Sequence, residues 1–177
     1  MTTQRLCVVV CAAGPAGRVT TLVDLARADG WDVQVVATPN ALALLDVDEI
    51  ERRCGSPVRS EYRVDRSGPR TGAADAIVMA PATYNSINKL AVGVNDTYAL
   101  NVVAEAIGRG IPVAVIPFVN TALAARRPFE AAVVALRAEG VRVIIGPGEW
   151  SPHPPGTGDR QLDAYPWQSA LAAIRAL

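Results

Sequence analysis

Apolar runs of strand length recur along the chain, and segments with helical spacing separate them. The runs are continuous rather than alternating, which is typical of parallel strands that are buried on both faces of a sheet. Five strands are predicted in this way, at residues 6–13, 32–38, 76–82, 112–118 and 141–146. A sixth, weaker strand is predicted at residues 57–64, where the alternation and the charges suit the edge of a sheet.

The segments between the strands carry recognisable helix ends. Residues 19–30 and 128–140 have apolar positions at helical spacing, and each segment ends in a glycine, Gly30 or Gly140, that suits a helix C-cap. Strands that alternate with helices through right-handed crossovers build an open sheet with helices on both faces. The pattern therefore predicts a single-domain, doubly wound, mostly parallel α/β fold over residues 1–177, of the Rossmann- or flavodoxin-like three-layer α/β/α type.

The region 146–166 interrupts this alternation. It is dense in proline and glycine, so it predicts a loop, and a short C-terminal helix follows at residues 167–177. A loop of this length is either functional or an ordinary surface segment. The sequence leaves both interpretations open: a mobile flap over a site, or a tail wrapped on the surface.

The overall composition excludes several classes of partner. Half of the 177 residues are hydrophobic, and 17 basic side chains balance 17 acidic ones. Without net charge there is no field that favours nucleic acid or a membrane surface, so neither partner is expected. Cys7, Cys11 and Cys54 are odd in number and lack metal-type spacing, which predicts no metal site and a reducing, cytoplasmic compartment. The apolar run near the N-terminus is too short to span a bilayer.

Candidate site residues follow directly after the predicted strands, because parallel sheets bind ligands at the carboxyl ends of their strands. After the first strand, Gly14, Pro15 and Gly17 form a turn that opens a helix. The turn matches neither the dinucleotide fingerprint nor a P-loop, so it is either a phosphate-binding helix start or a tight turn without a ligand. After the second strand come Thr38 and Asn40, where Thr38 suits a helix N-cap.

The third strand end is the richest in polar side chains. In "APATYNSINKLAVGVND", residues 80–96, Thr83, Asn85 and Ser86 gather at the start of a helix that needs only one capping residue. Asn120 follows the next strand in a similar position. Neutral amides and hydroxyls at several strand ends favour a site for a polar, ring-bearing cofactor. A generous helix cap is the structural alternative.

This stretch resembles the PASANT motif of the homo-oligomeric flavin-containing cysteine decarboxylases, in which P-A-S-A-N-T is followed by K-L/V-A-x-G-x-x-D. Residues 117–120, "PFVN", are similar to the family's P-A-M-N segment, and residues 38–41 fall at its Ser/Thr-x-x-Ala turn. The resemblance covers about residues 5–145. The motif positions in this chain are Pro81, Ala82, Thr83, Tyr84, Asn85, Ser86, Lys89, Leu90, Ala91, Gly93 and Asp96.

The resemblance implies a cofactor, a substrate class and an assembly. The cofactor would be FMN, with FAD less favoured, bound in a homotrimer or homododecamer that acts on a cysteine-containing small molecule or peptide. The flavin takes a hydride from the cysteine side chain before CO2 is lost. By resemblance, Asn85 and Asn120 would bind the substrate, and Asn85 would also be catalytic. The cofactor-binding residues would be Gly14, Pro15, Gly17, Thr38, Asn40, Pro81, Ala82, Thr83, Ser86 and Asp96.

The chain also departs from the family pattern. The family's catalytic histidine lies near the third strand, whereas residues 54–72 here contain no histidine. The single histidine, His153, lies in the proline-rich loop and is the candidate general base, or a solvated residue between prolines. Asp65, Glu61 and Tyr62 are the other candidates for a replacement base. Two functions thus remain open: an active flavin-dependent cysteine decarboxylase, or a catalytically inactive flavin-binding partner or regulatory subunit.

Two further classes compete with these. A flavin prenyltransferase shares the fold, but the basic run associated with that group is absent from residues 108–113, which read "GRGIPV". A small nucleotide- or sugar-phosphate-binding α/β module would lack flavin altogether. Three roles are open for Arg126 and Arg127, just before Pro128: binding a substrate carboxylate, contacting a neighbouring subunit, or lying solvated at the surface.

Overall fold

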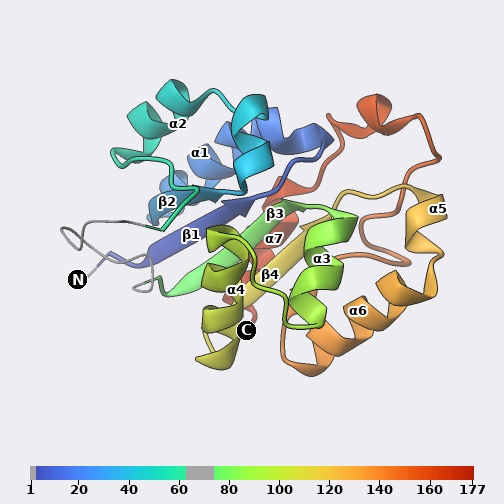
Figure 1. Ribbon diagram of the computed structural model, residues 1–177. Helices are drawn as coiled ribbons and strands as arrows, with labels where there is room; N and C mark the ends of the chain where they lie inside the picture. The colour runs from blue at the N-terminus through green and yellow to red at the C-terminus, as the bar shows by residue number, and fades with distance from the viewer. Residues whose placement is uncertain (1–2, 63–73) are drawn as a thin grey trace.

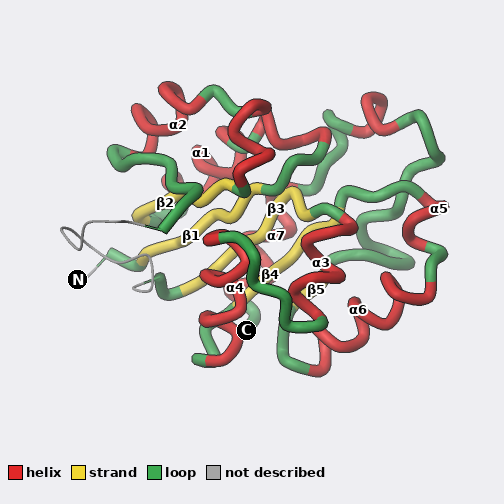
Figure 2. The backbone as a smooth tube through the Cα atoms, in the orientation of Figure 1, coloured by secondary structure: helices red, strands yellow, loops and turns green. Residues whose placement is uncertain are grey.

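A five-stranded parallel sheet forms the central layer of the computed structural model, which describes residues 3–62 and 74–177 (Figures 1 and 2). The strand order is β2-β1-β3-β4-β5, and every neighbouring pair is parallel. This order is that of flavodoxin-like sheets, so the predicted doubly wound fold class is confirmed. The strands are β1 (Arg5–Val10), β2 (Asp32–Ala37), β3 (Ala76–Ala82), β4 (Val113–Pro117) and β5 (Arg142–Val143).

Both faces of the sheet are buried, and for that reason its strands read as continuous apolar runs. In β1, Leu6, Val8 and Val10 face one hydrophobic core, while Cys7 and Val9 face the other. All five side chains are fully buried. Strands of this kind are confined to the middle layer of a three-layer fold.

The helices divide between these two cores. Residues of α1 (Thr20–Ala28), α2 (Val47–Cys54) and α7 (Trp167–Arg175) belong to one core. Residues of α3 (Tyr84–Ala91), α4 (Tyr98–Gly108) and α6 (Arg127–Ala138) belong to the other. The short elements are η1 (Gly14–Arg18), η2 (Pro39–Leu44), α5 (Thr121–Ala124) and η4 (Gly158–Gln161).

Most predicted boundaries agree with the structure to within a few residues. Gly30 and Gly140 follow α1 and α6 with φ of +87° and +88°, so both predicted C-cap glycines are confirmed. The predicted strand at 57–64 is reduced to one isolated bridge between Arg59 and Val36, and its last two residues lie outside the described part of the chain. No helix among the described residues is long and apolar enough to cross a membrane.

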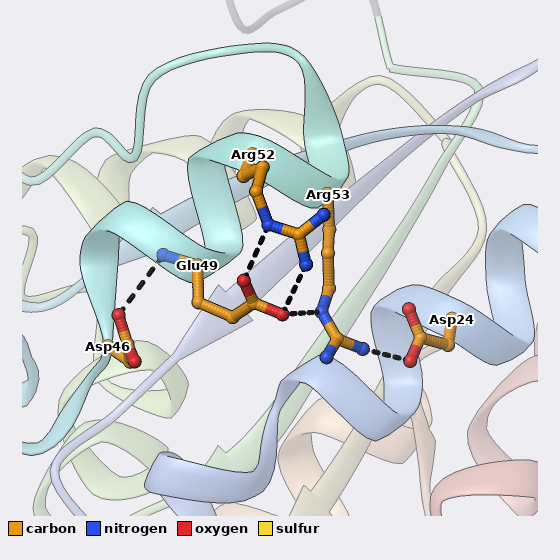
Figure 3. Close-up of polar contacts among 5 residues, drawn as sticks. All are labelled: Asp24, Asp46, Glu49, Arg52 and Arg53. Carbon is orange, nitrogen blue, oxygen red and sulfur yellow. Dashed lines mark hydrogen bonds and ion pairs between the residues drawn. The ribbon is translucent and has the colours of Figure 1, made fainter.

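A cluster of ion pairs joins α2 to α1 (Figure 3). Asp46 caps α2 by accepting a hydrogen bond of 3.1 Å from the backbone N–H of Glu49. The Glu49 carboxylate accepts hydrogen bonds from Arg52 at 2.7 Å and from Arg53 at 2.6 Å, and Arg53 also pairs with Asp24. The hydrogen bonds from Arg52 and Arg53 lower the pKa of Glu49 from 4.5 to about 2.

The depressed pKa of Glu49 predicts how its contribution to stability changes with pH. A carboxyl group whose pKa is lower in the folded state stabilises the protein above its unfolded pKa, and the effect is lost as pH falls through the folded pKa. Glu49→Gln should therefore lower Tm slightly at about pH 7, because the pairs are solvent-exposed, and the difference should vanish near pH 2. Asp48→Asn removes an exposed carboxylate from the same turn and serves as the control. An equal effect of both variants at every pH would contradict this account.

Candidate functional site

The carboxyl ends of all five strands lie at one edge of the sheet. The strand order reverses between β1 and β3, so the crevice of this fold type lies where these two strands end. Beyond the strands, the backbone N–H of Cys11 donates to the carbonyl of Pro81 at 3.0 Å, and that of Phe118 donates to Ala82 at 2.8 Å. The segments that follow β1 and β4 are thereby held against the carboxyl end of β3.

The polar side chains at the start of α3 mostly bond to one another. The Thr83 hydroxyl accepts from the backbone N–H of Ser86 at 3.1 Å and donates to the Ser86 hydroxyl at 2.9 Å. Ser86 is 5% exposed. The amide nitrogen of Asn88 donates to the carbonyl of Tyr84 at 2.7 Å. Helix capping, the structural alternative left open by the sequence, therefore accounts for much of this polar cluster.

Asn85 is the exception in this cluster. It is exposed at the second position of α3, and its side chain has no hydrogen-bond partner among residues 3–62 and 74–177. The structure thus leaves one free amide at the β3 end of the crevice. Its donor and acceptor are both available to a bound molecule.

Cys11 lies buried directly beneath the start of α3. Burial raises the pKa of its thiol, and hydrogen bonds with the Ser86 hydroxyl and the Thr83 backbone lower it only in part. Burial likewise raises the pKa of Cys7 to about 12 and that of Cys54 to about 11. All three cysteines are free thiols with little solvent access.

These thiols should be unreactive while the protein is folded. The thiolate is the reacting form, and burial suppresses both its formation and its accessibility. At about pH 8, close to the pKa of an ordinary thiol, Ellman's reagent should label none of the three cysteines in the native protein and all three after denaturation. Rapid native labelling of Cys11 would show that the start of α3 is not packed on it.

Asn120 and His153 are brought together at the carboxyl end of β4. They form an isolated parallel bridge, in which the backbone N–H of Thr121 donates to the His153 carbonyl at 2.8 Å. The Oδ1 atom of Asn120 accepts from the N–H of Leu123 at 2.9 Å and caps α5. Since Oδ1 is engaged, the Nδ2 group of Asn120 is the part that remains to contact a ligand.

Aromatic side chains hold the loop 146–166 against this strand end. The centroid of the Phe118 ring lies 4.8 Å from that of the His153 ring and 6.3 Å from that of the Trp150 ring. The buried Tyr165 hydroxyl donates to the Ile116 carbonyl of β4 at 2.7 Å. The loop therefore covers the carboxyl end of β4.

Both glycines of η1 have a packing reason to be glycine. A Cβ atom on Gly14 would lie 2.9 Å from Cε1 of Phe118 and 3.0 Å from Cδ2 of Leu162. A Cβ atom on Gly17 would lie 3.1 Å from the carbonyl oxygen of Leu44. Pro15 between them is buried. These contacts explain the glycines without a ligand. The start of η1 has no side-chain cap, and since the N–H of Ala16 donates to the Ala13 carbonyl, the N–H of Gly14 is the one that stays open there.

The remaining predicted cofactor residues differ in their positions. Thr38 is 8% exposed and precedes η2, but its side chain does not cap that element, and Asn40 is exposed beside it. Pro81 and Ala82 are buried within β3. Asp96 follows α3 and pairs with Lys89 of that helix, and no described contact joins it to Thr83.

The alternative bases do not gather at the crevice in any described contact. Tyr62 is exposed, and its ring packs edge-on against Tyr98, the first residue of α4, with 5.1 Å between the ring centroids. Glu61 is exposed beside it, and Asp65 lies outside the described residues. Among the candidates in residues 3–62 and 74–177, His153 is the one that contacts a strand-end residue.

A separate hollow of about 500 Å³ lies at the opposite edge of the sheet. It surrounds the amino ends of β1 and β2, where Arg5 pairs with Asp32 at 3.0 Å. Ligands of parallel sheets bind at the other edge. The hollow is therefore not the candidate site. Its lining residues are Thr3, Arg5, Arg27, Gly30, Trp31 and Asp32.

Two contacts near the crevice were not expected from the sequence, although Tyr84 and Phe118 lie within the motif segments. Phe118 directly follows β4 and contacts both η1 and the loop, and Tyr84 lies beneath the Arg126 guanidinium. An aromatic residue just after a buried strand is the signal that could have indicated Phe118. The contact between Tyr84 and Arg126 joins two distant segments, so no local pattern predicts it.

Comparison with known proteins agrees with this geometry. The sequence model of a protein family described as Flavoprotein matches residues 1–159. The chain is 29% identical over 99 residues, 53% of its length, to the Coenzyme A biosynthesis bifunctional protein CoaBC of Thermococcus kodakarensis, and the match spans 24% of that protein.

Two solved structures share the fold over almost the whole chain. The FMN-dependent cysteine decarboxylase SpaF has a TM-score of 0.73 at 24% identity, covering 97% of each chain. The FMN-dependent cysteine decarboxylase TvaF from thioviridamide biosynthesis has a TM-score of 0.73 at 23% identity, covering 98% of this chain and 99% of its own.

Proposed function

This chain belongs to the Flavoprotein family, and on that premise we propose that it binds FMN and oxidatively decarboxylates a cysteine-containing substrate such as the C-terminus of a peptide. The observation that carries the proposal is the free, exposed amide of Asn85 at the strand-order reversal. SpaF and TvaF, which share the fold, are FMN-dependent cysteine decarboxylases, and this likeness supports the choice of cofactor.

The residues at the crevice fit FMN. At the start of η1 the backbone N–H of Gly14 would contact the phosphate, because Pro15 has no N–H and the N–H of Ala16 already donates to the Ala13 carbonyl. Thr38 and Asn40, next to it across β1 and β2, would contact the rest of the cofactor. Bound FMN would supply the two-electron oxidation of the cysteine. Because the Thr83 hydroxyl proton is already donated to Ser86, these two residues would act mainly by fixing the start of α3.

Two amides would orient the substrate. Asn85 can donate its amide N–H to a carboxylate without breaking any existing hydrogen bond. Asn120 can do the same through Nδ2, because its Oδ1 is held by the N–H of Leu123.

His153 would accept the proton that the substrate thiol loses. Its Nδ1 lies 3.0 Å from the carbonyl oxygen of Pro154, which can only accept a hydrogen bond. In the neutral ring, Nδ1 therefore carries the proton and Nε2 holds the basic lone pair. A base on the loop, beside Asn120, would take the place of the histidine that residues 54–72 lack.

The assembly and the compartment are part of the same proposal. A homotrimer or homododecamer would follow from the resemblance to the cysteine decarboxylases, and a neighbouring chain would then add side chains to the crevice. A reducing, cytoplasmic compartment would follow from the odd number of cysteines without metal-type spacing. The alternative is a flavin-binding partner or regulatory subunit without activity. The absence of the usual histidine favours this alternative.

Mass spectrometry separates the enzyme from the inactive binder. The FMN-loaded protein is incubated with peptides that end in cysteine. Loss of one CO2 and two hydrogen atoms from the peptide is the expected result. Retained FMN with unchanged peptides, across several sequences, would reject the enzyme and leave the flavin-binding partner.

A further inference from the structure

Arg126 places a positive charge beside the first residue of α3 without a carboxylate to neutralise it. Its guanidinium carbon lies 5.9 Å from the centroid of the Tyr84 ring. The side chain is exposed, and it forms no ion pair with any residue in the ranges 3–62 and 74–177. Seven other arginines in this part of the chain pair with carboxylates: Arg5, Arg18, Arg52, Arg53, Arg109, Arg142 and Arg175.

Local stability does not explain Arg126. It occupies the N-cap position of α6, where its side chain forms no capping hydrogen bond. A cation at the amino end of a helix is opposed by the helix dipole, which favours acidic groups there. The cation–π contact with Tyr84 contributes only about 0.5–1 kcal/mol of interaction free energy at an exposed site. The residue at this position is therefore placed against local preference.

The aromatic platform below Arg126 is fixed by packing. The Tyr84 ring stacks on Phe129 with 5.7 Å between centroids and 16° between planes. Phe129 is 2% exposed and belongs to the core between the sheet and α6. The next residue after Tyr84 is Asn85, the free amide of the crevice. Consecutive residues of a helix point about 100° apart, so Arg126 and Asn85 would meet through a bound substrate rather than through direct contact.

We propose that Arg126, held over Tyr84, is the specificity-determining residue that binds a carboxylate of the cysteine substrate beside Asn85. The inference rests on the proposed function and names the substrate as a carboxylate-bearing one. A guanidinium binds a carboxylate through two parallel hydrogen bonds and keeps its charge at any relevant pH. The carboxylate is either the α-carboxylate of the terminal cysteine or an acidic side chain just before it.

Calorimetric titration of the FMN-loaded protein tests this role. The peptides are N-acetylated and end in serine in place of cysteine, so that no oxidation occurs: acetyl-Gly-Gly-Ser as free acid, acetyl-Gly-Gly-Ser amide and acetyl-Gly-Glu-Ser amide. Arg126→Gln should weaken binding of at least one carboxylate-bearing peptide about tenfold or more, the loss expected for a charge-assisted pair. It should leave the uncharged amide peptide unaffected. Which peptide loses affinity identifies the α-carboxylate or the side chain as the group bound.

Matched variants separate this role from a general charge effect. Arg127→Gln removes the same charge one residue away, without the aromatic contact, and should change affinity less than about twofold. Tyr84→Phe keeps the ring and should bind as the wild type does, whereas Tyr84→Leu should weaken binding of the same peptide that Arg126→Gln affects.

Two outcomes overturn the inference in distinguishable ways. If the wild type binds the carboxylate-bearing peptides and Arg126→Gln binds them equally well, Arg126 has no role in specificity and the proposed function stands. If the FMN-loaded wild type neither binds nor decarboxylates any of the corresponding peptides, the proposed substrate class fails, and the inference fails with it. Unchanged Tm in Arg126→Gln confirms that the comparison is made between folded proteins.

Discussion

Asn85→Ala should abolish decarboxylation while leaving the fold and the flavin content near normal. The side chain is exposed and unbonded among the described residues, so its removal opens no core cavity and breaks no hydrogen bond. Loss of a donor that contacts the reacting group lowers kcat by about 100-fold or more. The measurement is the rate of CO2 loss from a cysteine-terminated peptide, with Tm and flavin absorbance recorded on the same sample.

Asn88→Ala is the matched control for this variant. Asn88 lies one turn further along α3, and its amide bonds to the Tyr84 carbonyl within the helix. It should lose a little stability, about 0.5–1.5 kcal/mol for one hydrogen bond, and keep its activity. If Asn85→Ala decarboxylates at the wild-type rate, the free amide has no catalytic role and the chemical part of the proposal is wrong.

Gly14→Val should destabilise the protein strongly, and flavin loss should accompany the loss of stability. Even a single Cβ would lie 2.9 Å from the Phe118 ring and 3.0 Å from Leu162, so valine cannot fit unless the loop or η1 shifts. Overpacking of this kind typically costs about 1–3 kcal/mol. For a chain of this size, that lowers Tm by several degrees. Thermal unfolding with and without added FMN measures the effect.

The contact with Phe118 provides the control for Gly14→Val. Replacing Phe118 by leucine in the same chain should recover part of the lost Tm, because the clashing ring atom is removed. Gly108→Ala, where nothing lies within 4 Å of the added Cβ, should be neutral or slightly stabilising. A Gly14→Val protein with normal Tm that no longer retains FMN would instead show that glycine is needed for close approach of the ligand.

The fold was predictable because each strand carries its own signal. β3 coincides with the predicted apolar run at residues 76–82, and Gly30 and Gly140 mark helix ends by their backbone requirement. In the described part of the strand predicted at residues 57–64, only Arg59 pairs with a strand, at Val36. Pairing at the edge of a sheet depends on a partner strand, which a local sequence pattern does not determine.

The candidate site was less predictable than the fold. The sequence counts Thr83 and Ser86 as polar groups at a helix start, but it does not show that their hydroxyls bond to each other. It shows His153 in a loop of unknown position, and only the folded chain places this residue beside Asn120. Polar side chains satisfy local backbone groups first, so counting them overstates the number that face a ligand.

The most direct test of the central claim is titration of the purified protein with FMN, followed by absorbance and tryptophan fluorescence. The account predicts saturable, stoichiometric binding that turns the protein yellow. Binding should weaken when Gly17 of η1 or Thr38, directly after β2, is substituted. A protein that remains colourless and binds no added FMN would contradict it.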